Sequence, residues 1–362
     1  MKNFIFIISV IMMIFSFSSC TNPVNDVDET ELHTYGLFPS DNNTFTIFAS
    51  KSKYISDSYD YIDSLLFIKI DSTGNKLGQY GFSIPFRPYI QQVFLLNNGN
   101  IMIFGNISSY YSSGSIFEAS LTGAVLWEFE VPNGIYGASP SRDGNVFLFG
   151  GQYNNDQYES NYQDLLCTKM SRSGDTLWTK ILDISLRENF TTGIPTADNG
   201  CIALGTVWVE DRSTDMFATR FTETGDTMWT GSYGGDRYDN LNFATELSDG
   251  SYLLTGELNL YDSTNADWNF STGQQVYLIK VTANGETEWT RAIGNSLREH
   301  PNAIIEVSDG GFILLGTRDQ SFAYLFDETI GWINKISSNG DILWEQEFES
   351  ILPSGVYEIS TG

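Results

Sequence analysis

The chain has 362 residues, enough for one large domain or two ordinary ones. Its 45 acidic side chains outnumber 19 basic ones, and the formal charge of −26 argues against nucleic acid as a partner and against electrostatic adhesion to anionic lipid. Two histidines, His33 and His300, are too few to assemble a zinc site.

The first twenty residues have the layout of a secretory signal. Lys2 supplies one positive charge, an apolar run covers residues 4–17, and two serines precede Cys20. The run is too short to span a bilayer, and small residues at its end are typical of a cleavage site. This ending resembles the lipobox of bacterial lipoproteins, with Phe17 where Leu is usual, and it implies a signal peptide over 1–19 with lipid on the Cys20 sulfur. The alternative is an ordinary signal peptide with an incidental cysteine.

Residues 20–32 are polar and acidic, and they predict a flexible tether. Such a stretch after the lipidated cysteine also resembles a surface-export signal of Bacteroidetes lipoproteins. Removing the signal lowers the count of 19 basic side chains to 18 against 45 acidic ones, a balance of −27. The expected location is therefore the outer membrane, with the body either periplasmic or surface-exposed.

Residues 33–362 are built on a repeat. Gly-x-x-x-Trp occurs five times, and a sixth copy at Gly74 has Gly78 in place of the indole. A period of about fifty residues, made of strand-like segments, is typical of a β-propeller blade. We therefore predict a single all-β domain, a β-propeller of six four-stranded blades, with seven blades left open. The five tryptophans expected to be structural are Trp127, Trp178, Trp229, Trp289 and Trp344.

Each repeat holds two hairpins, which make the four strands A to D of a blade. If Asn284-Gly285 is a two-residue type I′ turn between strands C and D, Lys280 lies opposite Trp289. A cation stem on an indole gains packing and cation–π attraction, about 0.5–1 kcal/mol per exposed pair. The same count pairs Lys169 with Trp178, Arg220 with Trp229, Lys335 with Trp344, Lys69 with Gly78 and Glu118 with Trp127. The A–B turns are expected at 41–43, Asn98-Gly99, Asp143-Gly144, Asn199-Gly200, Asp249-Gly250 and Asp309-Gly310.

The Gly-x-x-x-Trp element resembles the tryptophan-docking motif of quinoprotein-type (PQQ-like) propellers, in which the indole packs between blades. The resemblance covers all six repeats, but the Ala and Asp that precede the turn in that motif are missing. The whole repeat is similar to the propeller repeats of Bacteroidetes-type lipoproteins. It implies a fold more than an activity.

Two families of propeller enzyme do not fit the sequence. A quinoprotein dehydrogenase needs a cofactor and calcium site, and we find neither a matching acidic–Asn cluster nor a vicinal cysteine pair. A sialidase Asp-box places Gly and Trp three residues apart, whereas they are four apart here. No cofactor is therefore expected. Calcium on the acid-rich segments 57–63 and 262–267 is left open, although neither has EF-hand spacing.

Besides Cys20, the expected site of lipidation, the folded body holds two cysteines, Cys167 and Cys201. Both lie in apolar strand contexts, so buried free thiols are expected. A disulfide would require strands of neighbouring blades to approach closely.

In a propeller the B–C loops and the D–A connections open on one face, called here the loop face. The B–C loops are long, varied and rich in Tyr, Trp, Asn and Asp. Variable aromatic loops on a regular scaffold are where recognition usually resides. The alternative is that their aromatic residues pack the loops on themselves. These loops are residues 50–63, 106–114, 152–164, 207–215, 259–275 and 318–329.

Four arginines lie eight or nine residues after the tryptophan position, on the D–A connections to the same face. One interpretation is ion pairing between blades, with Glu188, Glu299, Asp236 and Asp239 as partners. The other is a ligand site that holds a carboxylate or sulfate bidentately. The four candidates are Arg87, Arg187, Arg237 and Arg298.

The sequence favours a binding module over an enzyme. We predict a non-catalytic cell-envelope lipoprotein whose loop face binds a protein or a glycan, with membrane contact through the lipid anchor alone and no nucleic-acid partner. Two alternatives stay open. One is an envelope hydrolase or lyase acting on polysaccharide. The other is a structural subunit, as a resemblance to the propeller lipoprotein of the outer-membrane β-barrel assembly machinery would imply.

Overall fold

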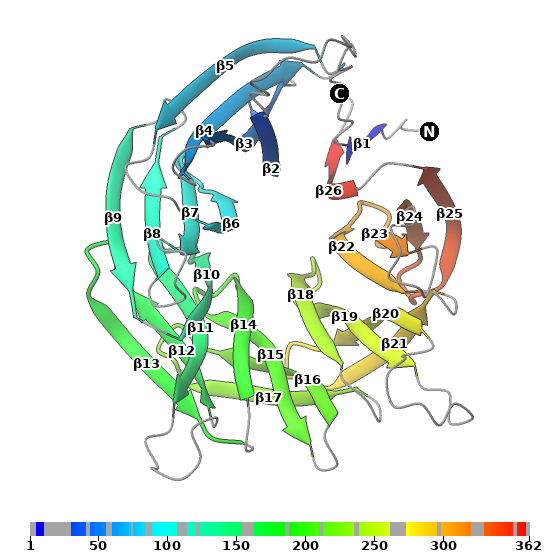
Figure 1. Cartoon of the computed structure of the whole chain (residues 1–362). Helices are drawn as coiled ribbons and strands as arrows, with labels where there is room; N and C mark the ends of the chain where they lie inside the picture. The colour runs from blue at the N-terminus through cyan, green and yellow to red at the C-terminus, as the bar shows by residue number, and fades with distance from the viewer. Residues whose placement is uncertain are drawn as a thin grey trace. The chain divides into compact units, whose positions relative to one another are not determined.

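Short apolar runs separated by Asp/Asn-Gly turns are expected to form strands, and the computed structural model contains only strands over the residues it describes (Figure 1). Those residues are 5–10, 30–40, 44–55, 60–71, 73, 75–83, 89–106, 114–120, 124–132, 134–153, 163–184, 188–209, 213–234, 239–260, 273–294, 298–319, 329–349 and 353–359. They form six four-stranded antiparallel sheets, so the predicted six-bladed β-propeller is confirmed. Within these ranges no helix is long and apolar enough to cross a membrane.

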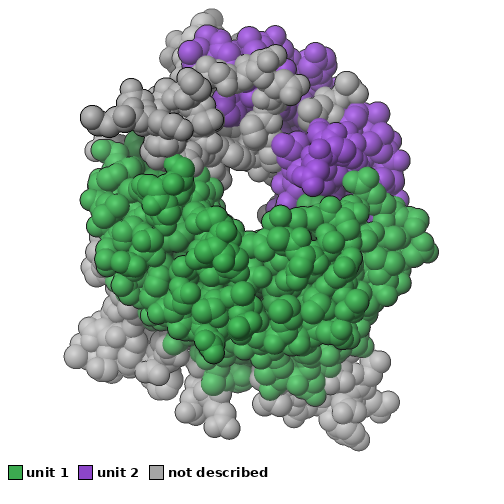
Figure 2. All heavy atoms as spheres, turned by 180° about the vertical axis from the view of Figure 1, so that it is seen from behind, with its two compact units in different colours: residues 1–10, 134–362 green, residues 11–133 purple. Residues whose placement is uncertain are grey.

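The chain divides into two units, residues 11–133 and residues 1–10 with 134–362 (Figure 2). The first of these holds two blades. Blade 1 contains β2 (Thr30–Ser40), β3 (Thr44–Ile55), β4 (Asp60–Asp71) and β5 (Lys76–Ser83). Blade 2 contains β6 (Tyr89–Leu95), β7 (Ile101–Asn106), β8 (Gly114–Ala119) and β9 (Val125–Val131).

The larger unit holds four blades, and the first strands of successive blades contact one another. Blade 3 contains β10 (Ile135–Pro140), β11 (Val146–Tyr153), β12 (Gln163–Met170) and β13 (Thr176–Leu182). Blade 4 contains β14 (Glu188–Pro195), β15 (Cys201–Val209), β16 (Ser213–Phe221) and β17 (Thr227–Tyr233). Blade 5 contains β18 (Asn240–Glu246), β19 (Tyr252–Leu260), β20 (Gly273–Val281) and β21 (Thr287–Ile293). Blade 6 contains β22 (Glu299–Glu306), β23 (Phe312–Asp319), β24 (Thr329–Ile336) and β25 (Ile342–Glu349).

A two-stranded sheet joins the two ends of the chain. β1 (Ile5–Val10) pairs antiparallel with β26 (Pro353–Ile359). Residues 354–360 (SGVYEIS) have the sequence of an extra strand after the last blade, and β26 confirms that prediction. β1 lies in the segment predicted to be a signal peptide.

The C–D hairpins have the predicted strand register, but their turn is not of the predicted type. In blade 5 the Gly285 N–H donates to the Thr282 carbonyl (2.9 Å), and φ is positive at Gly285 (84°) but not at Asn284. A type I′ turn needs positive φ at both central residues, so the predicted turn type is wrong. The observed loop has three residues, with glycine in the left-handed position. A bulge between Lys280 and Val281 then restores the pairing of Lys280 with Trp289.

All six predicted strand C–strand D pairs are confirmed. They are Lys69 with Gly78, Glu118 with Trp127, Lys169 with Trp178, Arg220 with Trp229, Lys280 with Trp289 and Lys335 with Trp344. The A–B turn of blade 4 is shifted by one residue from its predicted position. Asn199, not Gly200, has the positive φ (61°), so Asp198 occupies the place that Asp143 has in blade 3.

The cations that lie opposite the indoles form ion pairs with the A–B turn of their own blade. The Lys335 ammonium lies 2.7 Å from Asp309, and Lys280 lies 3.0 Å from Asp249. Buried Lys169 contacts Asp143 at 2.7 Å and has its cation–π contact with Phe147, not with the opposite indole. The hydrogen bond from Lys335 lowers the pKa of the Asp309 carboxyl. The ion pair with the turn aspartate, absent from the sequence prediction, ties the two hairpins of a blade together.

Three indoles of the larger unit pack on the turn glycine of the next blade. A Cβ on Gly225 would lie 2.7 Å from the Trp178 ring, and one on Gly285 would lie 2.6 Å from the Trp229 ring. The indole N–H groups of Trp178 and Trp229 donate to backbone carbonyls in the same two turns (2.9 and 3.1 Å). Gly340 receives Trp289 in the same way. Gly225, Gly285 and Gly340 therefore each supply both a positive φ and space for a neighbour's indole.

The other two indoles have different surroundings. Trp127 stacks on Phe129 with ring centroids 5.2 Å apart, and its N–H donates to Glu118 at 2.7 Å. Trp344, in β25, is exposed.

Candidate functional site

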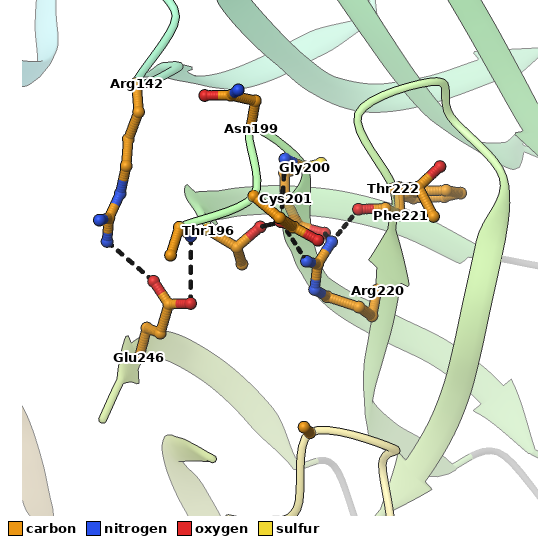
Figure 3. A network of polar contacts seen from close by, with 12 residues as sticks. Arg142, Thr196, Asn199, Gly200, Cys201, Arg220, Phe221, Thr222 and Glu246 are labelled. Carbon is orange, nitrogen blue, oxygen red and sulfur yellow. Dashed lines mark hydrogen bonds and ion pairs between the residues drawn. The ribbon is translucent and has the colours of Figure 1, made fainter. Parts of the chain in front are cut away.

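The A–B turn edge of blades 3 to 5 is held by contacts between blades (Figure 3). Arg142 lies 2.8 Å from Glu246, whose other oxygen accepts the Ala197 N–H at 3.1 Å. One blade further on, Glu306 accepts the N–H and hydroxyl of Ser248 at 2.7 and 2.8 Å. A carboxylate at the end of strand A thus binds the turn of the preceding blade. These turns serve the scaffold.

The opposite edge, where strand A begins, carries a second set of carboxylates. Glu188, Asp239 and Glu299 are each buried at the start of strand A. Glu188 accepts the Ile184 N–H (2.6 Å), Asp239 accepts the Asn259 N–H (2.9 Å), and Glu299 binds the Arg318 guanidinium (2.5 Å). Their expected pairing with Arg87, Arg187 and Arg237 involves arginines that lie outside the described residues, so it stays a prediction. Glu188 thus fixes a D–A connection, whereas Asp239 and Glu299 fix the start of strand A to strand B of the same blade.

Arg298 lies where the connections to strand A meet the B–C loops. Its backbone bridges Gln274, the second residue of β20, in a parallel bridge. The Arg298 carbonyl accepts the N–H of Asp319, the last residue of β23. The loop of blade 5 ends just before Gln274 and that of blade 6 begins just after Asp319. The D–A connection that carries Arg298 and the ends of the B–C loops of blades 5 and 6 therefore meet on one edge of the larger unit.

Beside Arg298, five polar side chains form a cluster between blades 5 and 6, called here the blade 5–6 rim. His300 Nδ1 lies 3.1 Å from Glu257 Oε1, and its Nε2 lies 3.8 Å from Asp319 Oδ2. Buried Glu257 also accepts from Asn242 (3.2 Å) and from Gln274. The His300 and Asp319 side chains are 37% and 39% exposed. The rim thus combines donors and acceptors that solvent can reach with a buried carboxylate that orients the imidazole.

The hydrogen bond with Glu257 and the nearby carboxylates outweigh burial and the Arg298 charge, and they raise the pKa of His300 above its ordinary 6.5. A raised folded-state pKa means that the stabilisation is fully present below pH 6.5 and is lost as the pH rises through the folded value. NMR titration of histidine-labelled protein should give a His300 midpoint above 6.5, with a His33→Asn variant assigning the two signals. Glu257→Gln should lower the midpoint, and an unchanged midpoint would remove this explanation.

The structure brings Arg298 to the rim. Arg87, Arg187 and Arg237 lie outside the described residues, as do Asp236, segment 262–267, and most of the B–C loops. Segment 57–63 is described in part, as strand from Asp60 onward.

One group of acids in the described part of the chain has oxygens close enough for a metal ion. Asp164, Asp183 and Glu188 each offer an oxygen within 4.8 Å of the others. Desolvation and the charge of Asp183 raise the pKa of Asp164. Because Glu188 already accepts the Ile184 N–H, a role in holding the D–A connection accounts for it.

Sequence reasoning missed His300 and Glu257 as site residues. They lie 43 residues apart in different blades, so no local motif joins them. The sequence does carry a weaker signal for the buried acids at the ends of two D–A connections. Gly234 and Gly294 each precede a buried acid by five residues, Asp239 and Glu299, and a Cβ on either glycine would lie 2.6 or 2.5 Å from that acid's side chain.

The described geometry defines a six-bladed β-propeller with a polar rim between blades 5 and 6. No family model and no curated protein matches the chain. Among solved structures, a protein of unknown function from Bacteroides caccae is 12% identical, with 82% of this chain and 95% of that chain covered and a TM-score of 0.45. A protein of unknown function from Dyadobacter fermentans is 10% identical, with 90% and 95% covered and a TM-score of 0.40. A Synechocystis apocarotenoid oxygenase mutant is 10% identical, with 73% and 62% covered and a TM-score of 0.42.

Proposed function

We propose that this protein is a non-catalytic envelope lipoprotein that binds a glycan or a protein on its loop face. The observation that carries the proposal is the blade 5–6 rim, where an imidazole, a guanidinium-bearing residue and a carboxylate lie near Gln274 and Asp319, the strand residues next to the long loops of blades 5 and 6. The turns on the other edge are occupied by contacts between blades, whereas His300 and Asp319 are open to solvent. Hydroxyl-rich ligands suit such a mixture of donors and acceptors. The Tyr- and Trp-rich sequences of the loops would supply surfaces for stacking.

Of the two ligand classes, a glycan with an acidic sugar best matches the side chains of the rim. Arg298 and a protonated His300 would offer two cationic groups in a protein of strongly negative charge, and a carboxylate held there gains local attraction. Asp319 and Gln274 would take sugar hydroxyls. Arg187 and Arg237, on the corresponding connections of blades 4 and 5, are proposed to extend the same surface, with Arg87 as their counterpart in blade 2.

The test is a glycan array probed with the purified full chain in detergent, followed by a pull-down for protein partners. We expect His300→Ala with Arg298→Ala to weaken binding at least about tenfold, since each lost charged hydrogen bond is worth about 1.5–3 kcal/mol. Arg172→Ala, an exposed arginine on the A–B turn edge, is the matched control and should bind normally. A lowered melting temperature with unchanged binding would assign the rim to the scaffold. Turnover of a bound polysaccharide would instead favour the hydrolase or lyase alternative.

The anchor is proposed on the Ser-Ser-Cys ending of the apolar N-terminal run. Replacing Cys20 with Ser removes the sulfur that would carry the lipid. We expect the variant to move from the detergent phase to the aqueous phase in detergent phase separation, because its other membrane attraction would be weak at a charge of −26. Wild-type protein and a Cys167→Ser variant should both remain in the detergent phase. Equal partitioning of Cys20→Ser and wild type would exclude lipidation at this residue.

A further inference from the structure

Two cysteines from neighbouring blades meet in the core of the larger unit. Cys167 lies in β12 of blade 3, and Cys201 is the first residue of β15 in blade 4. Their sulfur atoms are 3.8 Å apart, and both side chains are fully buried. They are 34 residues apart in sequence, so the close approach comes from the packing of the two blades. The condition that a disulfide requires, strands of neighbouring blades lying close together, is therefore met.

The surroundings of the pair are apolar. Both cysteines belong to a core cluster that includes Phe147 from blade 3 and Phe190 and Phe221 from blade 4. Among the described residues, each of the two thiols has the other as its hydrogen-bond partner. A bonded pair of sulfurs is about 2.05 Å apart, so closing the bond requires a movement of roughly 1.8 Å. Rotation of two short side chains supplies movements of that size without displacing a charged group.

We propose that Cys167 and Cys201 form a disulfide that joins blades 3 and 4. The oxidant is a second disulfide, of a protein or of glutathione. One cysteine thiolate attacks a sulfur of the oxidant and releases a thiolate, the mixed disulfide is then attacked by the other cysteine, and the oxidant leaves as two thiols. The two cysteine thiols lose two protons and two electrons in total, which the oxidant accepts.

The timing follows from burial. Desolvation and the neighbouring thiol raise the pKa of Cys167 well above its ordinary value, so the reactive thiolate is scarce in the folded protein. Oxidation must therefore take place while the blades assemble, and the finished bond is shielded from reductants. This inference is independent of what the blade 5–6 rim binds. It uses the proposed envelope location only as the source of an oxidant.

The test uses cell-free synthesis of the full chain in detergent, with oxidised glutathione in one reaction and a dithiol reductant in the other. The product is unfolded in the presence of an alkylating agent and digested with trypsin. Cleavage after Arg142, Lys169, Arg187 and Arg212 places Cys167 in peptide 143–169 and Cys201 in peptide 188–212. In the oxidised sample we expect these two peptides to be linked, with a combined mass lower by two hydrogen atoms, and to separate on reduction.

Cysteine-to-serine variants show which two cysteines are linked. Cys167→Ser or Cys201→Ser should abolish the link, whereas Cys20→Ser should retain it. Because a closed loop of this length stabilises the folded state mainly through the unfolded chain, the oxidised protein should melt about 3–5 °C higher than the reduced one. Alkylation of both thiols in the oxidised sample would overturn the proposal, and so would a link from either peptide to Cys20. Neither result bears on glycan binding, so the two proposals fail separately.

Discussion

Trp229→Ala is expected to lower the free energy of unfolding by about 3–5 kcal/mol, the usual cost of deleting a large buried aromatic side chain. The Trp229 side chain is part of a core cluster and the residue is 8% exposed. Its ring lies against the backbone of Gly285, and its N–H donates to the Ala283 carbonyl at 3.1 Å. Deleting the indole therefore leaves both a cavity between blades 4 and 5 and a carbonyl without its donor.

The measurement is denaturant unfolding followed by far-UV circular dichroism, which does not depend on the fluorescence of the deleted residue. Met228→Ala is the matched control, because Met228 precedes Trp229 on the same strand and is 50% exposed. A surface change of that kind should alter stability by about 0.5 kcal/mol or less. If the two variants unfold at the same denaturant concentration, Trp229 does not hold the two blades together.

The repeat made the number of blades and the pairing of strands predictable. Glycine in the left-handed region ends strand C at a fixed place, and side-chain alternation then determines which residues face each other. This is why the Lys280–Trp289 pairing could be counted from the sequence even though the turn type was wrong. The bulge that follows the turn adds one residue to strand D. That residue compensates for the different loop length.

Contacts between hairpins could not be counted in this way. The sequence pairs Lys169 with an indole because only the C–D hairpin is visible to a local argument. The carboxylate that takes its charge, Asp143, is 26 residues away on the other hairpin of the blade. A full ion pair in a buried setting outweighs a cation–π contact, so the aspartate determines where the ammonium points.

The candidate site was predictable only in outline. Topology alone sends the D–A connections and the B–C loops to one edge, and Arg298 confirms that they meet there. The contact of His300 with Glu257 depends on how blade 6 packs against blade 5, which no spacing within a repeat reveals. The proximity of Cys167 and Cys201 has the same origin. Inter-blade packing therefore supplies what the sequence pattern lacks.

The second large effect on stability is expected in blade 2, where the residue opposite the tryptophan is acidic instead of basic. Glu118 is buried in β8 and accepts hydrogen bonds from Asn98 (2.9 Å), Asn100 (2.6 Å) and the Trp127 indole (2.7 Å). The A–B turn of this blade carries Asn98 where blades 3, 5 and 6 carry Asp143, Asp249 and Asp309. The turn residue and the strand C residue have thus exchanged their roles as donor and acceptor.

Glu118→Lys should therefore destabilise the protein by about 3–5 kcal/mol, since it buries an ammonium among donors. Adding Asn98→Asp recreates the pair found in the other blades and should recover about 1–3 kcal/mol, with Asn98→Asp alone destabilising because two carboxylates then face each other. The three variants and the wild type form a double-mutant cycle, measured by denaturant unfolding. A coupling energy near zero would show that the turn does not sense the charge on strand C. A large favourable coupling would establish that each blade is closed by one donor–acceptor match between its two hairpins, whichever partner carries the charge.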